Sequence, residues 1–219
     1  LDSLPSHGLY VPGFSFGSFK EANETLLERV TITHTRSNAN VFIGRGNTLA
    51  TFHNCQITPY ITGAPAPIPG IVVDNAANIL FDSCEGNVNP GSVWLDFQST
   101  GHSSADIDGG ESCSIINCDV EINKEALIPR HDGYFIVLEG VSHPVLRNNL
   151  FYFSTKGVHL KNCYQALLAD NLFKDIRSSG TANPSPASLS LEASRQTTLL
   201  NNSWENPDSL IGGEAYPPG

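Results

Sequence analysis

Aligning the sequence with itself shows the feature that most constrains its fold, an internal repeat. In each copy a run of alternating apolar and polar residues ends in a small or amide residue, and a polar residue follows eight positions later. Four copies align without gaps: "GIVVDNAANILFDSCEG", "YFIVLEGVSHPVLRNNLF", "GVHLKNCYQALLADNLF" and "ASLSLEASRQTTLLNNSW". Two more fit when loops are allowed, "FIGRGNTLATFHNCQI" and "ADIDGGESCSIINCDV", and "TLLERVTI" is a weaker copy. A repeat of roughly 20 to 35 residues predicts a solenoid, in which each copy stacks on the next.

The period inside each copy decides the kind of solenoid. Val, Ile, Leu and Phe alternate with polar residues, and Asn, Asp and Gly interrupt the runs, which predicts short parallel strands and an all-β fold. The pattern resembles the right-handed parallel β-helix of the pectate-lyase-like superfamily, in which each turn carries three strands and stacked Asn side chains line one bend. The resemblance covers residues 25–205 and implies a solenoid of about six to seven turns.

One position of the repeat, the residue after the polar turn residue, forms a marker column. Its members are Val30, Cys55, Cys84, Cys118, Asn149, Asn171 and Asn202. The steps between them, by subtraction, are 25, 29, 34, 31, 22 and 31 residues. We expect these side chains to stack inside the coil, one strand spacing of about 4.8 Å apart. Stacked amides can satisfy one another by hydrogen bonds, and the cysteines should pack as small, reduced thiols.

The ends and the gaps between copies define the domain organisation. Residues 1–24 form an N-terminal segment and cap, and the stretch from Ser18 to Val30 has the composition of a short helix that would cover the open end of the coil. Residues 206–219 are rich in Pro and Gly and read as a C-terminal linker or tail. Two insertions, Asn87–Ser104 and Asn123–Gly133, are expected to shape a binding face, because loops on one side of a solenoid usually do so.

Composition excludes some classes of function. The net charge of −10 makes nucleic acid an unexpected partner. No apolar run approaches the roughly 20 residues of a membrane span, and no signal-peptide pattern opens the chain, so no membrane insertion is expected. The sequence has no methionine, not even at position 1, which suggests a piece of a longer protein.

Function is expected on the outward side chains of the first strand of each copy, because these alternate with the buried ones. Placing Val158 and Leu160 inside puts His159 and Lys161 outside. The same register predicts two outward columns: Ile43, Val72, Asp106, Val137, His159 and Ser190, and beside them Arg45, Asp74, Asp108, Glu139, Lys161 and Glu192. Like charges one strand spacing apart raise the pKa of one another's carboxyl groups, so the acidic members need a compensating group or a solvated surface.

Two kinds of polysaccharide chemistry fit such a column. A glycoside hydrolase needs a carboxylic acid and a carboxylate, for which Asp106, Asp108 and Glu139 are the candidates. The pectate-lyase resemblance implies instead a calcium ion on Asp74, Asp108 and Glu139, with Arg45 or Lys161 as the base. The sequence lacks the signature motifs of the lyases and of the polygalacturonases. We predict no cofactor and no metal, with calcium as the alternative, because "DIDGGE" begins like a calcium loop but lacks the remaining ligands.

Aromatic and histidine side chains complete the expected binding surface. His102 and His131 lie in the two insertions, beside Trp94, Asp96 and Tyr134, and together with His159 they could flank a sugar groove, because aromatics beside carboxylates suit sugar stacking. A loop tryptophan serves equally often as a local packing anchor, so both roles stay open for Trp94.

The chain is similar to the carbohydrate-engaging modules of viral tailspikes, which bind and often cleave a surface polysaccharide and usually assemble as trimers. The resemblance implies a polysaccharide partner, a homo-oligomer such as a trimer, and an extracellular or virion-associated location. The alternative is a non-enzymatic structural or decoration subunit of a larger assembly. In that case apolar outward residues such as Ile43, Val72 and Val137 should be buried against another chain.

Overall fold

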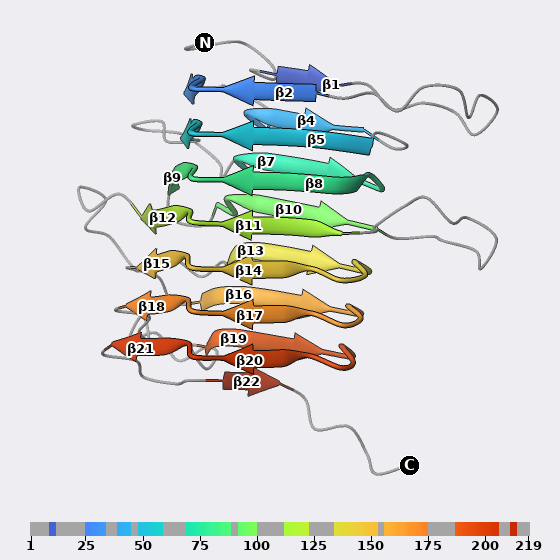
Figure 1. The fold of residues 1–219 in the computed structure, drawn as a ribbon, viewed down its shortest axis with the longest axis vertical. Coiled ribbons are helices and arrows are strands. Elements are labelled where there is room, and N and C mark those ends of the chain that lie inside the picture. Colours follow the sequence, from blue (N-terminus) through green and yellow to red (C-terminus); the bar gives the residue numbers. More distant parts are fainter. Residues whose placement is uncertain are drawn as a thin grey trace, which may run out of the picture.

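The computed structural model describes residues 9–11, 25–33, 39–44, 48–58, 69–88, 92–99, 112–122, 134–152, 156–174, 187–205 and 211–213. These residues form strands and contain no helix. The strands assemble into three parallel sheets (Figure 1). Among the described residues, no helix is long and apolar enough to cross a membrane.

Each sheet takes every third strand of the chain. The first sheet contains β1 (Leu9–Val11), β4 (Val41–Ile43), β7 (Ile71–Asp74), β10 (Leu95–Gln98), β13 (Tyr134–Glu139), β16 (Lys156–Lys161), β19 (Ala187–Glu192) and β22 (Ile211–Gly213). The second contains β2 (Thr25–Glu28), β5 (Thr48–His53), β8 (Ala77–Asp82), β11 (Cys113–Ile116), β14 (Val145–Arg147), β17 (Leu167–Ala169) and β20 (Thr198–Leu200). The third contains β3 (Thr31–Thr33), β6 (Gln56–Thr58), β9 (Glu85–Val88), β12 (Asp119–Ile122), β15 (Leu150–Tyr152), β18 (Leu172–Lys174) and β21 (Ser203–Glu205).

The chain therefore visits the three sheets in rotation, and equivalent strands of successive copies pair side by side (Figure 1). This arrangement is consistent with the predicted parallel β-helix. The handedness, the number of turns and a cap over the N-terminal end stay predictions. The predicted helix over Ser18 to Val30 is wrong where it can be tested, because Thr25–Glu28 forms strand β2, and residues 18–24 lie outside the described residues.

The bends of the coil explain the small and polar residues of the repeat. Several of these residues adopt a positive φ, which Gly, Asn and Asp tolerate best. They include Asn75, Gly140, Asn162 and Ala193 after the first sheet, and Asn54, Ser83, Asn117, Asn148, Asp170 and Asn201 after the second. The small or polar residue at the end of each strand run is therefore explained by the backbone conformation of the bend.

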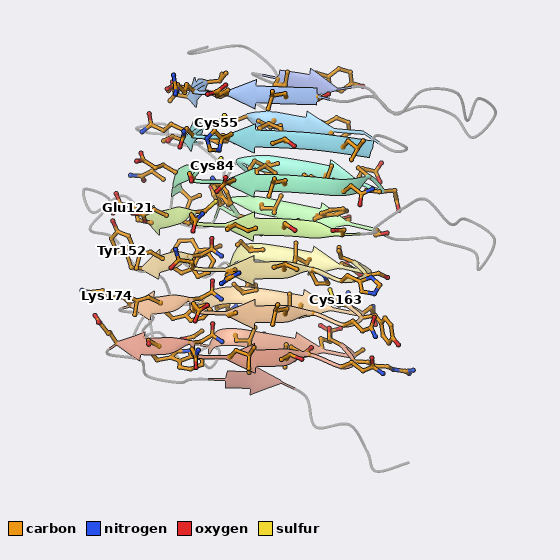
Figure 2. All side chains as sticks on the ribbon, in the orientation of Figure 1. Cys55, Cys84, Glu121, Tyr152, Cys163 and Lys174 are labelled. Atoms are coloured by element: carbon orange, nitrogen blue, oxygen red, sulfur yellow. The ribbon has the colours of Figure 1, made fainter. Side chains whose placement is uncertain are left out.

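The marker column is confirmed as a stack in the interior. Asn149 Nδ2 donates to Asn171 Oδ1 at 2.9 Å, and Asn171 Nδ2 donates to Asn202 Oδ1 at 2.9 Å. Asn171 Oδ1 also accepts the backbone N–H of Asn149, and Asn202 Oδ1 that of Asn171. In the same way, Cys118 N–H donates to Asn149 Oδ1 at 2.9 Å. The column continues as buried thiols, and Figure 2 shows Cys55 and Cys84 at the same place in neighbouring turns. All five cysteines are free and buried, as predicted.

Trp94 belongs to the core, where it fills a gap in a column of inward side chains. Its indole is fully buried, its Nε1 donates to Ile57 O at 3.1 Å, and its ring meets Phe81 edge to face. A Cβ at Gly86 would lie only 2.3 Å from the indole, so a glycine at this position is what admits the ring. Trp94 is thus the packing anchor, and the predicted sugar-stacking role is wrong because no part of the ring reaches the surface.

Candidate functional site

The outer face of the first sheet carries five of the predicted site residues, Asp74, Tyr134, Glu139, His159 and Lys161. Strand pairing aligns two columns of outward side chains along it. The first outward column is Tyr10, Phe42, Val72, Asp96, Val137, His159 and Ser190. The second outward column contains Asp74, Gln98, Glu139, Lys161 and Glu192. The sequence register is therefore correct from Val137 onward.

Two assignments in the earlier copies are wrong. The positions predicted for Asp106 and Asp108 are held by Asp96 and Gln98 of β10, which lies inside the segment predicted as an insertion. Ile43 is fully buried, and its neighbour Phe42 takes the outward place, because a slip of one residue exchanges the two faces of a strand. The predicted residues Arg45, His102, Asp106, Asp108 and His131 lie outside the described residues.

The ammonium group of Lys161 lies between two carboxylates on this face. Its Nζ lies 3.1 Å from Glu139 Oε1 and 4.0 Å from Glu192 Oε1, on the strands to either side. The hydrogen bond and the charge of Glu139 raise the pKa of Lys161, so the ammonium persists at neutral pH. The repulsion expected within the acidic column is thus relieved by a lysine placed between two glutamates.

His159 sits between an aromatic ring and a carboxylate. Its ring centroid lies 4.7 Å from that of Tyr134, and its Nε2 lies 3.3 Å from Glu192 Oε2. Burial lowers the pKa of His159, although Glu192 acts in the opposite direction. The imidazole is therefore mainly neutral at pH 7. Lys156 Nζ lies 5.3 Å from the centre of the Tyr134 ring, which adds a cation–π contact at the same place.

Asp96 was expected beside the groove, but its place in the first outward column was not predicted from the sequence. Gln98 Nε2 lies 3.1 Å and 3.3 Å from the two carboxylate oxygens of Asp96. Burial, together with the charge of Glu139, raises the pKa of Asp96. The stretch "WLDFQ" alternates as a strand does. Because "ADIDGG" alternates as well, alternation alone does not tell which of the two is the strand.

The spacing of Asp96 and Glu139 follows from strand geometry. They occupy neighbouring strands and differ by two residues in register, because Gln98 pairs with Glu139. One strand spacing and two residue rises together place their Cα atoms about 8 Å apart. The predicted residue Asp74 shares the second outward column with Glu139 but is two strands away from it. The structure therefore brings together Tyr134, Glu139, His159 and Lys161, and adds Asp96 to them.

The outer face of the third sheet carries a second line of polar residues. Glu121, Tyr152 and Lys174 follow one another along it, as Figure 2 shows, and Glu205 comes next. Asn87 Nδ2 donates to Glu121 at 3.3 Å, and Lys174 Nζ lies 3.2 Å from Glu205. Burial and Glu121 raise the pKa of the Tyr152 hydroxyl. This face supplies matched ionisable residues for control experiments.

Comparison with known proteins identifies no family for this chain. The sequence matches no protein-family model, and no curated protein matches it significantly. The crystal structure of a "putative glycosyl hydrolase" from Parabacteroides merdae is similar over 76% of this chain and 80% of that chain, with a TM-score of 0.34 and 12% identity. A likeness at this level carries no argument about activity. No group of three or more His, Cys, Asp or Glu side chains able to hold a metal ion occurs in the described part of the chain.

Proposed function

We propose that the outer face of the first sheet binds a polysaccharide and hydrolyses its glycosidic bonds, with Asp96 as the general acid and Glu139 as the general base. The observation that carries the proposal is the contrast between these two carboxyl groups. Asp96 is held toward its protonated form by burial, whereas Glu139 is paired with the ammonium group of Lys161. Two carboxyl groups in different environments are the requirement for acid and base roles at one pH.

In the proposed reaction Asp96 and Glu139 each transfer one proton. Asp96 donates its proton to the oxygen of the leaving sugar as the bond from that oxygen to the anomeric carbon breaks. Glu139 accepts a proton from a water molecule, whose oxygen bonds to the anomeric carbon from the opposite side. We propose the inverting reaction, which needs roughly 6.5 to 9.5 Å between the two carboxyl groups, because their Cα atoms stand about 8 Å apart on one face, whereas retention needs about 5 Å. Tyr134 and His159 are proposed to hold the sugar beside the pair.

The charge of the face favours hydrolysis of a neutral polymer over elimination from an acidic one. Besides Asp96, which acts in its protonated form, its described residues include three carboxylates, Asp74, Glu139 and Glu192, against two lysines, Lys156 and Lys161. A uronate polymer would meet net repulsion there. We therefore propose a neutral polysaccharide as the partner, with no metal required.

The test is depolymerisation of a panel of neutral and uronic-acid polysaccharides, followed by new reducing ends and by absorbance near 235 nm. We expect reducing ends without the unsaturated chromophore. Asp96→Asn and Glu139→Gln should each lower the rate by about 10² to 10⁴-fold. Glu205→Gln, which also breaks a lysine pair but on the third sheet, should leave it unchanged. Chromophore formation that is lost with a chelator would contradict hydrolysis and favour the calcium lyase.

The assembly and location remain proposals that rest on the resemblance to tailspike modules. We propose a homotrimer at a virion or cell surface, which light scattering of the purified protein would test. If no polymer is cleaved and a stable assembly forms, the structural or decoration role replaces the enzymatic one. Val72 and Val137 are the outward apolar residues that such an assembly would cover.

A further inference from the structure

The outer face of the first sheet also carries a group of three residues, Ser190, His159 and Glu192. The proposed glycoside hydrolysis uses only His159 of this group. Ser190 and Glu192 are two residues apart on β19, and both point outward. Ser190 pairs directly with His159 of β16, so the two side chains stand one strand spacing apart, about 4.8 Å at their Cα atoms. Glu192 Oε2 lies 3.3 Å from His159 Nε2. A serine, a histidine and a carboxylate therefore lie side by side on the outward face of the first sheet.

The contact with Glu192 fixes which imidazole nitrogen is free. A carboxylate accepts hydrogen bonds, so His159 Nε2 carries the proton that it donates to Glu192. Nδ1 then carries the lone pair and can accept a proton. Burial keeps the ring mainly neutral at pH 7, which a general base requires. The groups that face His159 are Glu192, Glu139, Lys161 and Tyr134.

We propose that Ser190, His159 and Glu192 form a nucleophilic triad that hydrolyses acyl esters, with O-acylated sugars of the bound polysaccharide as the substrate class. The arrangement follows the general logic of activated serines, in which a base takes the hydroxyl proton and a third group orients the base. Only the identity of the substrate rests on the proposed polysaccharide binding. The ester chemistry itself does not depend on Asp96.

The reaction proceeds through an acyl-serine, which water then hydrolyses. Ser190 Oγ attacks the carbonyl carbon of the ester while His159 Nδ1 takes the hydroxyl proton. The sugar oxygen leaves with that proton, and an acyl-serine remains. Water then attacks the acyl group, again with His159 as the base, and releases the carboxylic acid and the free serine. Lys161 Nζ, 4.0 Å from Glu192 Oε1, places a positive charge beside the trio, where it stabilises the negative tetrahedral intermediate.

The first test labels the nucleophile of the wild-type protein. A fluorophosphonate probe should react stoichiometrically, and mass spectrometry of the digested protein should place the adduct on the peptide that contains Ser190. His159→Gln should abolish the labelling, whereas Ser203→Ala, on β21 of the third sheet, should leave it unchanged. An adduct on another serine, or no adduct, would overturn the triad without any need for a folded variant.

The second test measures turnover on 4-nitrophenyl acetate and release of acetate from acetylated xylan. Ser190→Ala should lower both rates at least 100-fold, and Ser203→Ala, an exposed serine on β21 of the third sheet, should change neither. A Ser190→Ala protein that keeps the wild-type rates would refute the proposal. The two proposals fail separately, because new reducing ends report glycoside cleavage, whereas 4-nitrophenol and acetate report ester cleavage, which Ser190→Ala should remove. If 4-nitrophenyl acetate is cleaved and acetylated xylan is not, the triad stands and the polysaccharide assignment falls.

Discussion

Replacing Asn171 by alanine should destabilise the coil severely, because this buried amide joins three successive turns. Its Nδ2 donates to Leu146 O and to Asn202 Oδ1, both at 2.9 Å. Its Oδ1 accepts from Asn149 Nδ2 at 2.9 Å and from the backbone N–H of Asn149 at 3.1 Å. The side chain is only 1% exposed, so water cannot replace these bonds without opening the core.

The expected loss follows from the groups that would be left behind. Alanine removes the acceptor of the Asn149 N–H and the donor to Leu146 O, and each unsatisfied buried group costs about 1–3 kcal/mol. The cavity adds to this cost, so we expect a total loss of about 3–5 kcal/mol in the free energy of unfolding. Asn171→Cys should lose less, because Cys118 in the same column donates its thiol to Phe81 O.

The assay is urea unfolding followed by far-ultraviolet circular dichroism and by fluorescence of the two tryptophans. Asn148→Gly is the matched control, because Asn148 is exposed, its Nδ2 donates a hydrogen bond to Asn117 Oδ1 at 2.8 Å, and its positive φ is one that glycine accepts. It should change stability by less than about 1 kcal/mol. An Asn171→Ala loss no larger than that of the control would refute the reasoning that the interior ladder holds the turns together.

Three further predictions concern the core and the site. Gly86→Ala should displace Trp94, because the added Cβ would lie 2.3 Å from the indole, and a red shift of tryptophan fluorescence with a lower midpoint of unfolding would show it. Asp96→Asn should stabilise the protein at pH 7 but not near pH 3. The raised pKa of Asp96 means that its contribution to stability is present at low pH and is lost as pH rises through that pKa, so equal gains at both pH values would contradict it. Burial raises the pKa of Cys113, so this thiol should react with a disulfide reagent only after unfolding, and fast reaction of the native protein would be the contrary result.

The repeat allowed the fold to be predicted because the same physical demand recurs in every turn. Many positions with a positive φ hold Asn, Asp, Ser or Gly, and most of the interior column holds Asn or Cys, so both leave periodic marks in the sequence. The register was recovered wherever copies align without gaps, as at Glu139 and His159. It failed for β10, because a strand of four residues within a long connection has no flanking pattern to distinguish it from "ADIDGG".

The candidate site was predicted in part for the same reason. Glu139, His159 and Lys161 lie in the well-aligned copies, and alternation alone places them on one face. The role of Asp96 depends on burial and on the charge of Glu139 across a strand pair, which only three-dimensional packing sets. The burial of Trp94 depends on Gly86 of a neighbouring strand of the third sheet, and no local pattern around Trp94 records that gap.

The most direct test of the acid and base pair is the stereochemistry of its product. Proton NMR during the first minutes of polysaccharide cleavage shows which anomer is released before mutarotation. The proposed inverting reaction of Asp96 and Glu139, whose Cα atoms lie about 8 Å apart, predicts that the first anomer has the configuration opposite to that of the cleaved bond. Release of the retained anomer, or no cleavage of any neutral polymer, would contradict the account.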